Sequence, residues 1–144
     1  MNKKAEKFIA YLKEHDISAF AAGEEFTDEF HTVLYRSNIE VEGQKLPIAL
    51  ILDDTVFSIF RVHIADKVIK NGNSNILLEH LNELNRKYKI FKYYITEQDN
   101  LCLDCCVTAT DEMFSWEIVS GMIDLIIEQL TEHYPILMKK IWSN

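Results

Sequence analysis

The chain has 144 residues and a formal net charge of −8, with 48% hydrophobic and 26% charged residues. A chain of this length can bury its own core, so we expect one domain over residues 1–144 that needs no disulfide or metal to fold. The hydrophobic fraction excludes a disordered chain, and charges interrupt every apolar run long enough to cross a membrane. Because 23 acidic residues outnumber 15 basic ones and no Lys/Arg stripe occurs, we expect neither nucleic acid nor a membrane as partner.

The start of the chain and its cysteines both indicate a cytoplasmic protein. Charges at Glu6, Lys7, Lys13 and Glu14 interrupt any segment that could act as a secretory signal. The three cysteines, an odd number, all lie within residues 102–106. Such usage fits a reducing compartment.

The first part of the chain predicts a helix and the start of a sheet. Apolar residues at helical spacing predict an amphipathic helix over residues 3–15. Residues 16–30 have no clear period and are expected to form a loop or a broken strand. From residue 31 to 41 apolar and polar residues alternate as in a half-buried strand, and Gly43 can supply the positive φ that a short hairpin loop requires.

The strand after this hairpin, residues 46–52, contains the continuous apolar run IALIL at residues 48–52. Such a run is typical of a strand buried on both faces, so we expect a central place in the sheet. Asp53 and Asp54 then turn the chain into a third strand over residues 56–64.

The next segments predict a second helix and a second hairpin. Turn-forming residues 71–75 precede the helix. The strands are expected over residues 90–96 and 101–110, on either side of the polar turn at 97–100. The apolar side of the helix is formed by Leu77, Leu78, Leu81, Leu84 and Tyr88.

The last helix, over residues 113–130, is apolar around more of its circumference than one sheet-facing stripe requires. Its polar side chains fall within an arc of about 120° when each residue is placed at 100°. We therefore expect a second surface of this helix to be covered by other helices or by another subunit. Pro135 is expected to bend or restart the helix. The possible interface consists of Trp116, Ile118, Met122, Leu125 and Ile127.

The predicted elements follow the order α-β-β-β-α-β-β-α, without an internal repeat. Antiparallel hairpins that alternate with single helices are typical of an α+β sandwich. We therefore predict an α+β fold, in which an antiparallel sheet of five to six strands carries helices on one face.

The residue patterns predict no catalytic site, no cofactor and no metal site. In a strand, Cys102 and Cys106 share a face but lie about 13 Å apart, and Cys105 points the other way, so the three cannot chelate one ion. The five histidines are scattered without local pairing. The acidic group at residues 24–29 lacks the spacing of a calcium loop and is interpreted as a solvated turn.

Two segments of the second half carry a family resemblance. The run LLEHLNELN at residues 77–85, followed by FKYYITEQDNL at residues 91–101, resembles the YbjN family of bacterial sensory transduction regulators. The resemblance implies a fold like that of the type III secretion chaperones, which are small, acidic and often dimeric. It implies a binding role and no catalytic residues. Where the family turn often has Asp-Gly, this chain has Asp99-Asn100.

Three functions are considered on these grounds. The leading hypothesis is a non-enzymatic, regulatory or chaperone-like module that forms a homodimer and captures an apolar segment of a partner protein. The second is a small-molecule sensor with a pocket between sheet and helices, lined by aromatics such as Phe57, Tyr93 and Trp116. The third, least favoured, is a thiol enzyme that uses one of the three cysteines.

Overall fold

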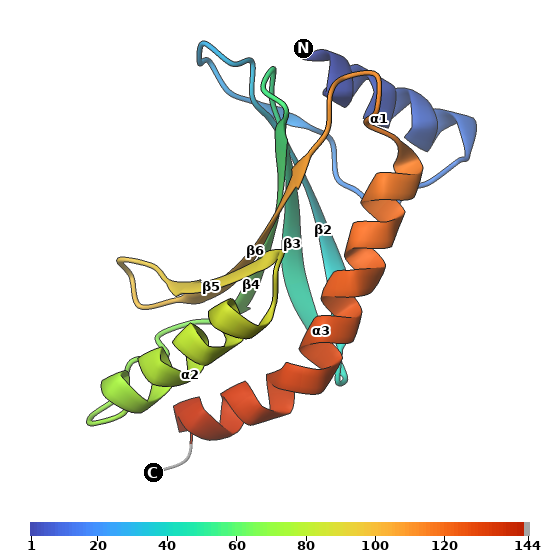
Figure 1. The fold of residues 1–144 in the computed structure, drawn as a ribbon. Helices are drawn as coiled ribbons and strands as arrows, with labels where there is room; N and C mark the ends of the chain where they lie inside the picture. Colours follow the sequence, from blue (N-terminus) through green and yellow to red (C-terminus); the bar gives the residue numbers. More distant parts are fainter. Residues whose placement is uncertain (143–144) are drawn as a thin grey trace.

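Six strands and three helices make up the structure, a computed structural model that describes residues 1–142 (Figure 1). The predicted α+β class is confirmed. The helices are α1 (Lys3–Glu14), α2 (Ser74–Lys87) and α3 (Trp116–Trp142). The strands are β1 (Glu24–Glu25), β2 (Val33–Val41), β3 (Gln44–Leu52), β4 (Phe57–Ala65), β5 (Phe91–Ile95) and β6 (Leu101–Thr108).

All six strands form one antiparallel sheet in the order β1-β2-β3-β4-β6-β5. The chain runs through β2, β3 and β4 as consecutive hairpins, and α2 then carries it to the far edge, where β5 and β6 form the last hairpin. The predicted order lacked only β1, a two-residue strand within the segment expected to be a loop or broken strand. The central place of β3 is confirmed.

The hairpin turn between β2 and β3 sets the pairing register of these two strands. Glu42 and Gly43 both have positive φ, 50° and 76°, as a two-residue hairpin turn requires. Val41 lies opposite Gln44, and the pairing continues without a shift to Val33 opposite Leu52. This unbroken register decides which side chains of β2 and β3 become neighbours.

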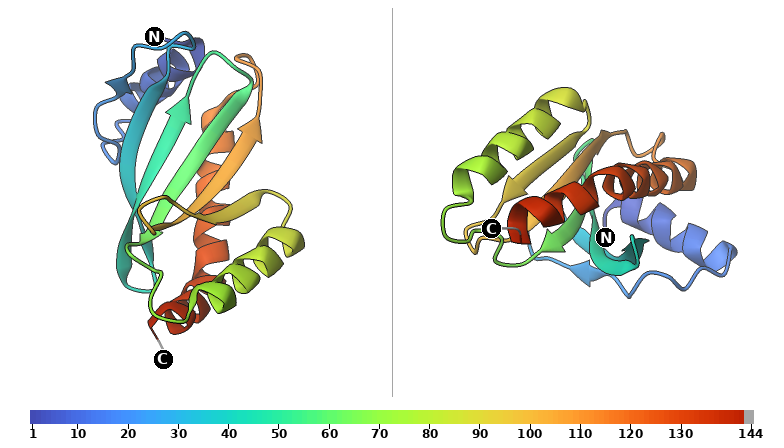
Figure 2. Two further views of the ribbon diagram at one scale, coloured as in Figure 1. Left: turned by 90° about the vertical axis from the view of Figure 1, so that its left-hand side faces the viewer. Right: turned by 90° about the horizontal axis from the view of Figure 1, so that it is seen from below.

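The helices cover one face of the sheet, where the core lies. Figure 2 (left) looks onto the other face, with α1 and α3 behind the strands. Alternate strand residues such as Tyr35, Leu50 and Phe60 point toward the helices and are at most 2% exposed. The helices add, among others, Phe8 of α1, Leu77 and Leu81 of α2, and Ile126 and Leu130 of α3.

The expectation that β3 is buried on both faces is wrong. Ile48, Leu50 and Leu52 are buried, whereas Ala49 and Ile51 on the opposite face are partly exposed. An apolar run shows that a strand lacks polar side chains, but it does not supply a layer to cover them. Within residues 1–142 no helix packs on that face, so β3 presents apolar side chains to solvent.

The last helix begins at Trp116, three residues later than predicted, and contains Pro135 in its interior. Proline has no N–H to bond the carbonyl of Thr131, which weakens the helix at this point without ending it. Figure 1 shows the final turns of α3 running in a new direction alongside α2, and Trp142 lies next to Lys70, just before α2 begins. The prediction of a bend is confirmed, and the helix continues to Trp142.

The outer edge of β5 is closed by a side chain of α2 rather than by another strand. Asn85 donates through Nδ2 to the Tyr93 carbonyl at 3.0 Å, and its Oδ1 accepts from the Tyr93 N–H at 2.8 Å. The amide therefore satisfies the same two groups that a neighbouring strand would, which protects an exposed sheet edge.

We expect the substitution Asn85→Ala to lower the free energy of unfolding by about 1–3 kcal/mol, because the N–H and carbonyl of Tyr93 lose their partners. Urea denaturation followed by circular dichroism measures the change. Asn82→Ala is the matched control, since Asn82 is an exposed asparagine of the same helix. Equal losses in the two variants would contradict this role of Asn85.

Candidate functional site

The uncovered face of the sheet carries an apolar strip that crosses four strands. The pairing register places its members directly opposite one another on β2, β3, β4 and β6. Neighbouring strands are about 4.8 Å apart, so these side chains lie in contact range of each other. The strip, called the apolar row below, consists of Leu34, Ile51, Ile59 and Cys106.

A charged row runs parallel to the apolar row, two residues further along each strand. It crosses the five neighbouring strands β2, β3, β4, β6 and β5, and a small residue lies between its two arginines. In register, this charged row consists of Arg36, Ala49, Arg61, Asp104 and Lys92.

Arg61 is held in a fixed position by Asp104 on the next strand. Its Nε and Nη2 groups donate to the two carboxylate oxygens, both at 2.9 Å, and the Tyr94 hydroxyl donates to Oδ1 at 2.9 Å. The hydrogen bonds and the negative charge of Asp104 raise the pKa of Arg61. Burial, together with the hydrogen bond to Asp104, raises the pKa of Tyr94. Arg61 is therefore a permanent, preorganised cation on this face.

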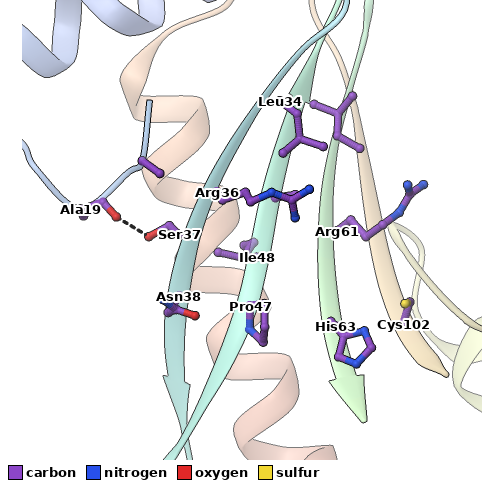
Figure 3. Close-up of a pocket in the computed structure, with 13 residues that line it drawn as sticks. Ala19, Leu34, Arg36, Ser37, Asn38, Pro47, Ile48, Arg61, His63 and Cys102 are labelled. Carbon is purple, nitrogen blue, oxygen red and sulfur yellow. Dashed lines mark hydrogen bonds between the residues drawn. The ribbon is translucent and has the colours of Figure 1, made fainter. Parts of the chain in front are cut away.

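A hollow of about 560 Å³, called the Arg hollow below, lies on this face around the charged row (Figure 3). Figure 3 shows Arg36, Arg61 and His63 extending from β2 and β4 to the same side of the sheet. Ala49 lies between the two arginines, and its short side chain leaves space there. Apolar residues such as Leu34 and Ile51 form the wall that joins this hollow to the apolar row.

A second cavity of about 470 Å³, called the helix–sheet cleft below, lies between β2 and α3. Of the three aromatic residues expected around such a pocket, only Trp116 lines it. Phe57 is 53% exposed in β4 and does not line the cleft, whereas Tyr93 is buried and accepts a hydrogen bond from Gln129. The other apolar walls of the cleft include Phe20, Ile39, Ile123 and Ile127.

The five residues of the possible interface on α3 lie on two sides of the helix. At 100° per residue, Ile118, Met122 and Leu125 share one side, and Leu125 is 43% exposed. Trp116 and Ile127 lie on the opposite side, where both line the helix–sheet cleft. The first three, called the α3 ridge below, stay the candidate surface for a subunit or partner.

The three cysteines point to the faces of β6 that the strand pattern predicted, and they differ in exposure. Cys105 points into the core, and burial raises its pKa to about 11. Burial also raises the pKa of Cys102, which lies on the other face of β6. Cys106 is exposed. In the folded protein at neutral pH we expect iodoacetamide to label the exposed Cys106 and to spare Cys102 and Cys105, as read by mass spectrometry. Labelling of any one of the three cysteines much faster than a free thiol would support the thiol-enzyme hypothesis.

Two histidines lie near the contact between α2 and the last turns of α3. Burial lowers the pKa of both His80 and His133, and His133 shares a hydrogen bond of 2.7 Å with the Tyr88 hydroxyl. At His80, the positive charge of Lys140 lowers the pKa further, and the negative charge of Glu83 raises it. At His133, the negative charge of Glu132 raises the pKa, and the positive charge of Lys87 lowers it.

Because their pKa is lower in the folded chain, the unfolded chain binds more protons just below pH 6.5. Stability should therefore fall as the pH falls from about 6.5 toward the folded-state pKa values. Urea midpoints measured between pH 7.5 and 5 test this. The variant His80→Gln should flatten the profile, and an unchanged slope would contradict the assignment.

The acidic group at residues 24–29 is exposed, as expected for a solvated turn. Asp28 accepts hydrogen bonds from the Thr32 backbone and hydroxyl, which lower its pKa. In the described part of the chain, no cluster of three or more His, Cys, Asp or Glu side chains could hold a metal ion. No helix within residues 1–142 has the length and apolar character needed to span a membrane.

The fold and its surfaces thus define an α+β domain with one covered and one open sheet face. Comparisons of the chain with protein-family models, with curated proteins and with solved structures found no match. The resemblance to the YbjN family stays a prediction.

The Arg hollow did not emerge from the sequence, although its signal was present. Arg36 and Arg61 each occupy a polar position of an alternating strand, and Ala49 interrupts the bulky run of β3. Only the register of three strands shows that these residues are neighbours.

Proposed function

We propose that the protein is a non-enzymatic protein-binding module of regulatory or chaperone-like type, cytoplasmic and homodimeric. The observation that supports this is the open sheet face, where the apolar row lies beside two arginines with no covering layer in residues 1–142. A contiguous apolar surface bordered by charged groups is typical of a protein–protein interaction site.

The physical basis of binding is burial of this apolar surface. Each square ångström of apolar surface removed from water contributes about 25 cal/mol, so covering Leu34, Ile51 and Ile59 favours association. The arginines at the border give orientation, because a guanidinium pairs with a carboxylate in a defined geometry. The net charge of −8 keeps the remaining surface soluble.

A homodimer and a captured partner need two separate surfaces. The chain offers the open sheet face and the α3 ridge, whose Leu125 is 43% exposed. A resemblance to the YbjN family and to type III secretion chaperones, as inferred from residues 77–101, agrees with this division.

The test combines oligomeric state with partner capture. Light scattering should give twice the subunit mass of 16.8 kDa. Tagged protein from the native cell should retain a protein that also binds when both components are purified, and either Leu125→Glu or Ile51→Glu should abolish that binding. Gln98→Glu, which adds the same charge at an exposed position of the β5–β6 turn, is the control. A strict monomer that retains no protein would contradict the proposal.

A small-molecule sensor is the second candidate, and the helix–sheet cleft favours it. Its volume of about 470 Å³ lies in the range of ligand pockets, and Trp116 provides an aromatic wall. Native mass spectrometry of protein from the native cell should then show a bound small molecule. The variant Ile123→Trp, which fills the cleft, should lose it, and a wild-type protein free of ligand would exclude this function.

A further inference from the structure

One exposed segment of the chain combines carboxylates with aromatic side chains. Residues 24–30, with the sequence EEFTDEF, are all exposed and are called the acidic segment below. Phe26 and Phe30 are 49% and 45% exposed, which is unusual for two phenylalanines so close in sequence. Glu29 has no ion-pair partner among residues 1–142. The acidic segment therefore offers a free carboxylate next to exposed rings.

The Arg hollow has the complementary chemistry. Two arginines and a histidine line it, and its thirteen lining residues include no Asp or Glu. The carboxylates that pair with its arginines, Glu24 and Asp104, belong to the flanking strands β1 and β6. His63 likewise pairs with Asp66, so each of these groups has one carboxylate partner, and what the hollow offers a ligand is its unused hydrogen-bond donors.

The arginines keep hydrogen-bond donors free for a ligand. Arg36 donates through Nε to Glu24 at 2.7 Å, and within the described residues its two Nη groups have no partner. Arg61 uses Nε and Nη2 for Asp104 and leaves Nη1 without a partner in the same residues. Because Asp104 and Tyr94 fix Arg61, binding a further carboxylate would cost little side-chain entropy.

We propose that the Arg hollow of one subunit binds the acidic segment of a second copy of the chain. Glu29 pairs with the two Nη groups of Arg36, and the phenylalanine rings pack on the apolar wall at Leu34 and Ile51. The inference rests on the homodimer of the proposed function and names its interface. It assigns the open face to self-association and leaves the α3 ridge for the partner protein.

The second copy is favoured over another protein because both halves of the contact lie on the same chain. The acidic segment borders the Arg hollow, since Glu24 at its start pairs with Arg36 at 2.7 Å. A two-fold axis can therefore place each acidic segment on the other subunit's Arg hollow, so that every contact is made twice. The pair within one subunit also shows that the Arg36 guanidinium can donate to a carboxylate of the segment.

Charge reversal at the two members of the contact tests the pairing. Arg36→Glu and Glu29→Arg should each raise the dimer dissociation constant at least about tenfold, as measured by sedimentation equilibrium, because each places like charges at both contacts. An equimolar mixture of the two variants should dimerise again, since every contact then joins opposite charges. Circular dichroism checks that both variants are folded.

Matched controls separate this contact from general effects. Arg86→Glu reverses an exposed arginine of α2, and Met113→Ser removes an apolar side chain that is 64% exposed. Both should dimerise as the wild type does, whereas Phe30→Ser should weaken the dimer.

Three outcomes would overturn the inference, and they have different consequences for the proposed function. If both charge-reversal variants dimerise normally and Leu125→Glu is monomeric, the α3 ridge is the dimer interface and the homodimer stands. If the wild type is monomeric at every concentration, the inference and the homodimer both fail, while partner capture is judged by its own experiment. A mixture that stays monomeric would also exclude the pairing of Glu29 with Arg36.

Discussion

Replacing Lys4 by alanine is expected to lower the free energy of unfolding by about 4 kcal/mol. The Lys4 side chain is fully buried, and its Nζ donates to the Phe57 carbonyl at 2.8 Å and to Ser58 Oγ at 2.9 Å. Its charge faces Asp53 at 4.0 Å, and burial lowers its pKa. Truncation leaves a cavity and removes the donor from these acceptors, so two costs add.

Urea denaturation measures this loss, and the chain provides a close control. Lys3 is the preceding residue of α1 and is exposed, so Lys3→Ala should change stability little. Lys4→Met, which keeps most of the volume but not the donor, should fall between the two. A loss at Lys3 as large as that at Lys4 would contradict a special contribution of the buried ammonium group.

Replacing Arg61 by methionine is expected to lower the free energy of unfolding by about 2–3 kcal/mol. The Asp104 side chain is 7% exposed and would lose both guanidinium hydrogen bonds, keeping only that of Tyr94. The expected loss is smaller than for a fully buried pair because the Arg61 side chain is 43% exposed. Thermal unfolding followed by circular dichroism measures it.

A double-mutant cycle measures the interaction energy between Arg61 and Asp104 apart from the contribution of each residue alone. Arg61→Met combined with Asp104→Leu should be more stable than Arg61→Met alone, because no unpaired buried carboxylate remains. Arg86→Met is the control, since Arg86 is exposed on α2 and has no ion-pair partner among residues 1–142. Additive losses in the cycle would contradict a coupled pair.

Helices and strands with a regular spacing of apolar residues could be predicted from the sequence, whereas their neighbours in space could not. The spacing of Ala5 and Phe8 placed α1, and the alternation along β2 and β6 assigned inward and outward residues, including the opposite directions of Cys105 and Cys106. β1 was not predicted because two residues carry no period. Its strand pairing depends on β2, a partner distant in sequence.

The candidate site depended on information that a single sequence does not contain. The hydrophobicity of β3 predicted a strand buried on both faces. Whether Ile51 contacts a helix or water depends, however, on where α3 packs. The same holds for the α3 residues, because only tertiary packing shows that Trp116 faces the helix–sheet cleft while Leu125 is exposed. Arg36 and Arg61 are 25 positions apart and become neighbours through two hairpins.

The way in which both sheet edges end limits how copies of the chain can assemble. At one edge the Asn85 amide occupies the hydrogen-bonding groups of Tyr93. At the other edge, the two-residue β1 pairs with one end of β2. Further along β2, the Ala21 N–H donates to the Arg36 carbonyl at 2.9 Å. Strand-by-strand growth into filaments is therefore hindered at both ends of the sheet. A two-fold contact between sheet faces closes with two subunits, so a concentrated solution of this protein should hold discrete particles rather than fibres.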